Sequence, residues 1–233
     1  MLTAASVKNE WARRVQAEHN SAANTAELLS WLLFENVSPA LIKECHRIVD
    51  DEVIHSALSL QVLEAAGGSA DIAASRRTSG PIAMEPNAPT ILRALAVTSS
   101  IFCCGETTAV PLFKAMHATA KRPLAKRVLA RILKDEGRHR AFGWALLDEL
   151  LAKTGDRGVA FVQARVDHYV AGTLAAYTGP EFPLTAKERA WGLILASSYT
   201  AAAAKCIDEE IRPRFAKRGI HAAAAVAPAR GTP

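Results

Sequence analysis

The sequence contains the pattern Asp-Glu-x-x-His twice, at residues 51–55 and 135–139. Side chains three positions apart on an α-helix share one face, so Glu52 and His55 can direct an oxygen and a nitrogen toward a common point. Glu136 and His139 can do the same. Carboxylate oxygens and imidazole nitrogens bind first-row metal ions, so each copy predicts half of a metal chelate, provided that both segments are helical.

A third carboxylate comes from the segment before the second copy. Glu106 is the only acid in the apolar run 101–113, and it lies 30 residues before Glu136. A buried glutamate at such a place requires a positive partner. We therefore interpret Glu106 as a metal ligand, while a glutamate satisfied by an ion pair is the alternative interpretation.

The fourth carboxylate should come from the N-terminal segment, which offers Glu10, Glu18, Glu27 and Glu35. Periodicity alone does not choose among these four. Glu18 lies 34 residues before Glu52 and Glu27 lies 25 before it, and a longer turn between the helices accommodates a spacing of 34 more readily. Glu18 also falls on a helical stripe with Trp11, Ala22, Leu29 and Leu32. We therefore prefer Glu18.

Four glutamates and two histidines in this arrangement are typical of helical bundles that bind two metal ions. Four carboxylates balance the charge of two ferrous ions, although the same ligands also suit manganese or a mixed manganese and iron pair. Asp51 and Asp135 each precede a predicted ligand. We expect each to hydrogen-bond a ligand histidine of the facing half, with an exposed helix-surface acid as the alternative. The predicted metal ligands are Glu18, Glu52, His55, Glu106, Glu136 and His139.

Long helices are needed to position these side chains, and the apolar spacing of three and four predicts them. The segments expected to be helical are Ala4–Asn36, Pro39–Ala66, Thr90–Thr119 and Pro123–Lys153. Between the second and third lies a stretch with glycine and proline punctuation, residues 69–89, which predicts a long crossover. Pro111 predicts a kink inside the third helix. The chain thus reads as all-α, with the plan of a four-helix bundle.

Two additional C-terminal helices are predicted at about 159–177 and 185–217, around a loop containing Gly179, Pro180 and Pro183. Residues 1–219 would form one domain, with a core at about 4–153, and residues 220–233 a disordered tail. His168, Tyr169, Tyr177 and Tyr199 belong to the added helices, and we consider them as a guess for the lining of a substrate pocket.

Composition restricts the class of protein. The four cysteines form no CxxC motif and no signal peptide is evident, so we expect a reducing, cytoplasmic setting. No run of about 18 uncharged apolar residues predicts a membrane span. The net charge of +5 comes from basic residues spread among acids, so nucleic-acid binding is not expected.

The motifs resemble those of the ferritin-like di-iron carboxylate superfamily, over about Arg13 to Leu151. Within it, Glu18-His19 with Pro39, Leu41 and Asp51-Glu52 is similar to stand-alone bacterial ferritin-like proteins. The spacing of both halves is also similar to that of the arylamine N-oxygenases. Those enzymes carry a further histidine ligand one turn before the last glutamate, where this chain has Ile132.

The resemblance implies a non-haem di-iron enzyme that uses dioxygen to hydroxylate, desaturate or N-oxygenate a small organic substrate, with an external electron donor. The alternative is an iron-handling or peroxide-detoxifying protein without an organic substrate. A cage of many chains would favour storage, whereas a monomer or homodimer would favour the oxygenase. A bundle that has lost its metals is the third hypothesis.

Overall fold

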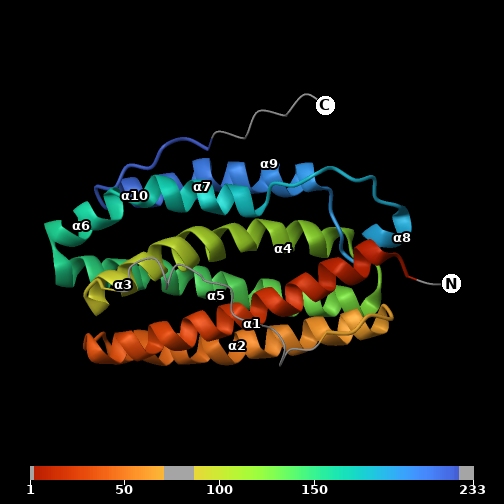
Figure 1. The fold of residues 1–233 in the computed structure, drawn as a ribbon, viewed down its shortest axis with the longest axis horizontal. Helices are drawn as coiled ribbons and strands as arrows, with labels where there is room; N and C mark the ends of the chain where they lie inside the picture. Colours follow the sequence, from red (N-terminus) through yellow and green to blue (C-terminus); the bar gives the residue numbers. More distant parts are fainter. Residues whose placement is uncertain (1–2, 71–86, 226–233) are drawn as a thin grey trace.

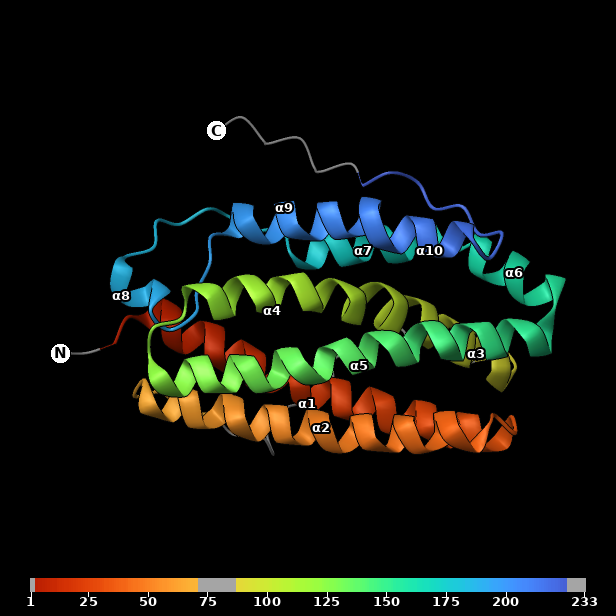
Figure 2. The same ribbon diagram turned by 180° about the vertical axis from the view of Figure 1, so that it is seen from behind.

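The computed structural model describes residues 3–70 and 87–225, and within these ranges it is helical with no β-strand. The prediction of an all-α chain is confirmed. The helices form three layers, with α1 and α2 on one side, α3, α4 and α5 in the middle, and the C-terminal helices on the other side (Figure 1; Figure 2 from behind). The predicted crossover at residues 69–89 falls almost entirely outside the described residues.

The first layer pairs two long helices, α1 (Ala5–Phe34) and α2 (Pro39–Ala65). Pro39 opens α2, where its missing N–H costs no helical hydrogen bond. Each helix buries one stripe of residues three or four positions apart, which is the pattern of a helix with one face in the core. Polar side chains occupy the middle of both stripes, namely Glu18 and Thr25 in α1, and Asp51, Glu52, His55, Ser56 and Ser59 in α2.

The middle layer holds the other two long segments. One runs continuously through α3 (Thr90–Val97), the π-helical η2 (Thr98–Glu106) and α4 (Thr107–Thr119), and the other is α5 (Pro123–Thr154). Pro111 lies inside α4 and the helix continues through it, while the departure from α-helical hydrogen bonding precedes it, in η2. The Thr107 carbonyl, which the proline ring leaves without its helical donor, accepts a hydrogen bond from the Cys206 thiol at 3.4 Å.

The prediction of two added C-terminal helices needs correction, because each expected helix is divided into shorter ones. The first becomes α6 (Asp156–Gln163) and α7 (Val166–Ala176), separated at residues 164–165. The second becomes α8 (Ala186–Arg189) and, after a non-helical stretch, α9 (Ala196–Cys206), which continues through η3 (Ile207–Ile211) into α10 (Arg212–Ala216).

The break between α8 and α9 has a physical cause that the spacing of apolar residues does not reveal. The Ala190 carbonyl accepts hydrogen bonds from the backbone N–H groups of Lys121 and Arg122, at 2.9 and 2.8 Å, so the chain is tied to the turn before α5. Gly192 then adopts φ +91°, and a Cβ there would lie 2.7 Å from a Leu129 methyl carbon. This docking holds residues 190–195 out of a helix.

At the C-terminal end the described chain stays attached to the helices. Ile220 is fully buried, the His221 N–H donates to the Gln163 side chain at 2.7 Å, and the Ala223 N–H donates to Asp167 at 2.7 Å. The predicted disordered tail was placed at 220–233, and its residues 226–233 lie outside the described residues.

One helical run in the described part of the chain, Thr90–Thr119, is long and apolar enough to span a membrane. However, 67 % of its most apolar 18-residue window is buried inside the protein. A mostly buried apolar helix is what the core of a soluble protein contains, so this run is consistent with a soluble protein.

The apolar core consists of two clusters. One surrounds Leu28, Phe102, Leu147 and Phe215, and the other surrounds Trp11, Met116, Leu129 and Trp191. Between them the four long segments contribute the polar residues named above, together with Glu106, Thr107, Thr108, Asp135, Glu136 and His139. The interior therefore has a polar layer with an apolar cluster on either side, and this layer contains the predicted ligands.

The close approach of α5 to η2 generates a prediction about stability. A Cβ at Gly143 would lie 2.5 Å from Cβ and 3.0 Å from the carbonyl carbon of Phe102, and backbone atoms cannot move aside cheaply. We expect Gly143→Ala to lower the free energy of unfolding by about 1–3 kcal/mol. Gly172→Ala is the matched control, because a Cβ there meets nothing within 4 Å, and should raise it by about 0.5–1 kcal/mol. Urea denaturation measures both, and equal effects would contradict the packing argument.

Candidate metal centre

The six predicted ligands meet in the polar layer. Each is buried, with at most 8 % of any of them exposed. The side chains come from all four long segments, with Glu18 on α1, Glu52 and His55 on α2, Glu106 at the end of η2, and Glu136 and His139 on α5. The structure therefore brings together every residue that the sequence predicted as a ligand.

Their donor atoms form two overlapping groups. Glu18, Glu52, His55 and Glu136 make up one group, and Glu52, Glu106, Glu136 and His139 make up the other. Within each group, one oxygen or nitrogen from every residue lies within 4.8 Å of the others. Glu52 and Glu136 belong to both groups, so they lie where carboxylates that bridge two neighbouring ions would be needed.

The hydrogen bonding of these side chains tests whether they fit metal ions. Among the described residues, four buried atoms of the cluster have no hydrogen-bond partner: Oε2 of Glu52, Oε2 of Glu136, and Nδ1 of His55 and of His139. The two imidazole atoms nevertheless face Glu52, since Nδ1 of His139 lies 3.2 Å from its Oε1 and Nδ1 of His55 lies 3.7 Å from its Oε2. Hard and borderline cations bind these donor types, so the residues present fit a metal centre, whose identity the donors do not decide.

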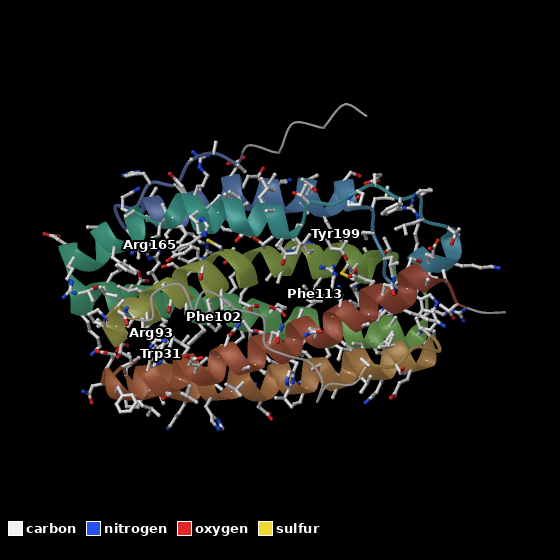
Figure 3. The ribbon with its side chains drawn as sticks, viewed as in Figure 1. Trp31, Arg93, Phe102, Phe113, Arg165 and Tyr199 are labelled. Atoms are coloured by element: carbon white, nitrogen blue, oxygen red, sulfur yellow. The ribbon has the colours of Figure 1, made fainter. Side chains whose placement is uncertain are left out.

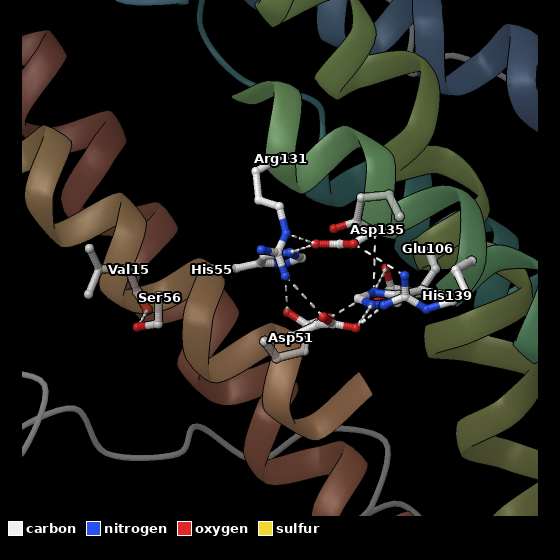
Figure 4. A network of polar contacts seen from close by, with 11 residues as sticks. Val15, Asp51, His55, Ser56, Glu106, Arg131, Asp135 and His139 are labelled. Carbon is white, nitrogen blue, oxygen red and sulfur yellow. Dashed lines mark hydrogen bonds and ion pairs between the residues drawn. The ribbon is translucent and has the colours of Figure 1, made fainter. Parts of the chain in front are cut away.

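Each histidine holds its other nitrogen against an aspartate of the facing helix. Nε2 of His55 lies 3.2 Å from Oδ2 of Asp135, and Nε2 of His139 lies 3.4 Å from Oδ2 of Asp51 (Figure 4). The predicted contacts of the two aspartates with the opposite histidine are thus present. A proton on Nε2, held by the aspartate, leaves Nδ1 free to act as a ligand on the side of the glutamates.

Two arginines, which the sequence analysis did not identify, complete this outer network. Arg131 donates to Asp135 at 2.5 Å and lies 3.5 Å from Asp51, and Arg138 contacts both aspartates and also Glu44 at 2.8 Å. Both arginines come from α5. Arg131 lies four residues before Asp135, and Arg138 lies three residues after it. This helical spacing could have indicated the contacts from the sequence.

The pKa values of the cluster follow from crowding of like charges in a buried place. Burial and the nearby Glu52 carboxylate raise the pKa of Glu18 to about 8. Burial and the Glu106 carboxylate raise the pKa of Glu136 well above its usual value. Burial also acts to raise the pKa of Glu52, but its contacts with His139 and His55 outweigh this and lower it to about 2.

The neighbouring carboxylates also raise the pKa values of the two histidines. Burial acts against the charged form of His139, yet the carboxylates of Glu106 and Glu52 outweigh it and raise the pKa of this ring to about 10. The pKa of His55 is raised as well, because Glu52 outweighs burial. Without metal, protons on these groups thus compensate the excess of buried negative charge at neutral pH.

The π-helical segment η2 ends on Glu106. A π-helix accommodates an extra residue per turn and is frequent at functional sites. Glu106 is thereby placed in the polar layer, while Phe102 packs on α5 and the Thr108 hydroxyl donates to the Cys104 carbonyl at 2.8 Å. Nothing in the amino-acid pattern indicated this departure from the α-helix.

A cavity of about 340 Å³ adjoins the centre. Three predicted ligands line it, namely Glu18, Glu106 and Glu136, and other side chains come from α1, η2 and α4. Tyr177 and Tyr199 line it from the C-terminal layer and stack on each other, with ring centroids 6.4 Å apart. Figure 3 shows Tyr199 and Phe113 of α4 in the same half of the molecule.

The guess about four pocket residues was right for two of them. Tyr177 and Tyr199 line the cavity, whereas His168 is exposed and Tyr169 is buried in the apolar cluster around Phe102.

The fold and the site together define an all-helical protein with a buried cluster of glutamates and histidines that can hold metal ions. No known protein family, no curated protein and no solved structure matches the chain. The functional assignment therefore depends on the site itself.

The pKa values predict that metal binding releases protons. At pH 7, Glu18 and His139, with pKa values of about 8 and about 10, hold protons that a metal must displace, so we expect release of about two protons per chain or more on saturation with Zn²⁺. At pH 9 the release should be smaller, because Glu18 is then already ionised. Titration in weakly buffered solution with a pH indicator measures this, and equal release at both pH values would contradict the assignment.

The outer network predicts an effect on metal affinity. Replacing Asp51 or Asp135 by Asn removes the carboxylate that orients the opposite histidine, and we expect metal affinity to fall about 10–100-fold. Asp50→Asn is the control, because Asp50 precedes Asp51 on the exposed side of α2 and should leave affinity unchanged. Competition with a chelating dye measures all three variants. Similar losses for Asp50→Asn and Asp51→Asn would argue against an orienting role.

Proposed function

We propose that this chain is a ferritin-like four-helix bundle protein that binds two metal ions and uses them to activate dioxygen. The observation that carries the proposal is the pair of overlapping donor groups that share Glu52 and Glu136. The plan of four long helical segments, with one carboxylate from each and one histidine from two of them, supports it. Iron is the expected metal, and manganese or a mixed pair would suit the same ligands.

Two iron ions would supply the redox chemistry with dioxygen, which no side chain of the chain can perform. The residues themselves have other tasks. Glu18, Glu52, Glu106, Glu136 and the two histidines would hold the ions, and Asp51 and Asp135 orient the histidine rings through Nε2. The apolar clusters on either side exclude water from the polar layer, which strengthens every electrostatic interaction within it.

The cavity favours an enzyme with an organic substrate over an iron-handling or peroxide-detoxifying protein. A volume of about 340 Å³ is in the range of small-molecule sites and is much larger than dioxygen or hydrogen peroxide requires. Its wall contains Ile101, Leu112 and Phe113 beside the ligand carboxylates. Hydroxylation, desaturation and N-oxygenation of a small organic molecule all remain compatible with this arrangement.

N-oxygenation has one argument against it. The position of the additional histidine ligand in the arylamine N-oxygenases is Ile132 here, which is fully buried in the apolar cluster around Trp11. The described residues provide no third imidazole near the centre.

The reaction would also need an external electron donor, because reduction of dioxygen consumes electrons that the described residues do not supply. A reducing, cytoplasmic setting suits the four cysteines, which are all free and buried. We propose a monomer or homodimer without a membrane or nucleic-acid partner.

Anaerobic titration with ferrous iron tests the proposal. We expect about two ions per chain, and consumption of dioxygen when the loaded protein is exposed to air with a reductant. Because Glu52 and Glu136 belong to both donor groups, Glu52→Ala and Glu136→Ala should abolish binding of both ions, whereas Glu18→Ala and Glu106→Ala should weaken mainly one.

Glu64→Ala is the control for these variants, since Glu64 lies on the exposed face of α2, outside the polar layer. It should bind iron as the natural chain does. Binding of fewer than one ion per chain by the natural protein would contradict the dimetal centre. Full binding with no consumption of dioxygen would contradict the enzyme.

A further inference from the structure

One end of the cavity carries a buried cation. Arg14 is the only positively charged side chain among the described residues that line the cavity, and it lies one helical turn before Glu18 on α1. Only 10 % of its side chain is exposed, compared with 61 % for the neighbouring Arg13. The guanidinium lies over the rings of Phe113 and Trp11, at 4.7 and 5.6 Å from their centroids. It is therefore fixed in position and removed from water.

The charge of Arg14 is only partly balanced. Arg14 and Arg13 share one carboxylate, Glu10, at 2.9 and 3.0 Å. Glu10 also accepts a hydrogen bond from the Tyr199 hydroxyl at 3.1 Å. These two arginines and one glutamate leave one positive charge, and the nearby Glu18 belongs to the metal centre. Because Arg14 shares its carboxylate partner with Arg13, this end of the cavity keeps a net positive charge and favours a further anion.

The hydrogen bonding of Arg14 leads to the same conclusion. A guanidinium has five N–H donors. Its Nη2 atom contacts Glu10 and the Met116 sulfur, at 2.9 and 3.1 Å, while Nε has no hydrogen-bond partner within the described part of the chain. Arg14 thus retains donors for a further acceptor, and a planar carboxylate matches guanidinium geometry.

The side of the cavity formed by η2 and α4 suits a hydrocarbon, since Ile101, Ala109 and Leu112 line it together with the ring of Phe113. Helix α1 contributes polar side chains to the lining, namely Asn20, Ser21 and Asn24. Side chains at positions i and i+4 of a helix lie about 5–6 Å apart at Cβ, so a ligand held at Arg14 would carry its next few carbon atoms past Glu18 and the centre. The cavity therefore has a cationic end, apolar side chains from η2 and α4, polar side chains from α1, and three of the predicted metal ligands in its lining.

We propose that the cavity binds an organic acid, with its carboxylate at Arg14 and its hydrocarbon part beside Glu18, Glu106 and Glu136. This inference deepens the proposed function, because it names the substrate class of the same site. Arg14 is then the residue that determines specificity: it holds the anionic end away from the metals and leaves the hydrocarbon end next to them.

Calorimetric titration with hexanoate tests this, both in the metal-free protein and in protein loaded with Mn²⁺. Hexanol and hexylamine serve as neutral and cationic ligands of the same length. We expect hexanoate to bind at least tenfold more tightly than either. Arg14→Met should weaken hexanoate binding about tenfold or more, because it removes the charge partner, while hexanol binding changes little.

Two further variants keep the test interpretable. Arg13→Met is the matched control, since Arg13 contacts the same Glu10 from the exposed side, and it should change hexanoate affinity by no more than about twofold. The double variant Glu10→Gln/Arg14→Met removes both members of the buried pair, so no uncompensated charge remains to disturb folding. It should lose hexanoate binding just as Arg14→Met does.

Paramagnetic relaxation by Mn²⁺ reports the orientation of the ligand. Protons at the hydrocarbon end of hexanoate should relax faster than those next to the carboxylate. The reverse order would place the carboxylate on the metals and overturn the proposal, as would equal binding of hexanol or unchanged binding in the two Arg14 variants. Failure of the proposed function is separate, because it appears as missing metal binding, while hexanoate binding to the metal-free protein still tests Arg14.

Discussion

The central constraint of this structure is the burial of four carboxylates and two imidazoles at one place between two apolar clusters. Four buried negative charges cannot coexist in a medium of low polarity without compensation. Protons provide it in the metal-free chain, as the raised pKa values of Glu18, Glu136 and His139 indicate. Two divalent cations would provide it more completely, because they also satisfy the carboxylate and imidazole atoms that have no hydrogen-bond partner in the described chain.

This constraint explains why the centre lies in the middle of the helices. A helix that buries one stripe can place a polar residue in that stripe only where the facing helices do the same. Here α1, α2, η2 and α5 all carry their ligands in the buried stripe, and the apolar clusters close the layer from both ends. This polar layer replaces apolar packing in the middle of the core. All six donor side chains must therefore find partners at the same time.

The sequence predicted this layer well because its signal was local. Asp-Glu-x-x-His at helical spacing specifies one face of a helix, and two copies specify two helices that face each other. Glu106 was found because an acid in an apolar run needs a partner. Glu18 was chosen by spacing among four candidates, and its place in the buried stripe of α1 agrees with that choice.

The features that were missed depend on contacts between distant segments. The periodicity of residues 185–217 is continuous, yet hydrogen bonds from the turn before α5 to Ala190 hold the chain out of a helix. The helix expected at 185–217 is therefore divided between α8 and α9. The enclosure of the cavity by Tyr177 and Tyr199 likewise requires that the C-terminal layer packs on α4 and η2.

The centre has two chemically different sides. On the side of α2 and α5, the histidines meet Asp51 and Asp135, which are bound by Arg131 and Arg138, and Arg131 is 45 % exposed. Both arginines come from α5. The position in α2 that corresponds to Arg131 is Arg47, whereas the position that corresponds to Arg138 is Ile54, so the first half shares the ligands of the second but only part of its arginine pattern.

The other side is formed by α1, η2 and α4, and there the cavity meets Glu18, Glu106 and Glu136, while neither histidine lines it among the described residues. A molecule in the cavity thus approaches the carboxylates, which can change their mode of binding, and not the histidines. The histidines are fixed by a charged network that includes two aspartates and two arginines. Rigid support on one side and adaptable ligands on the other would let the centre accept a substrate without losing its metals.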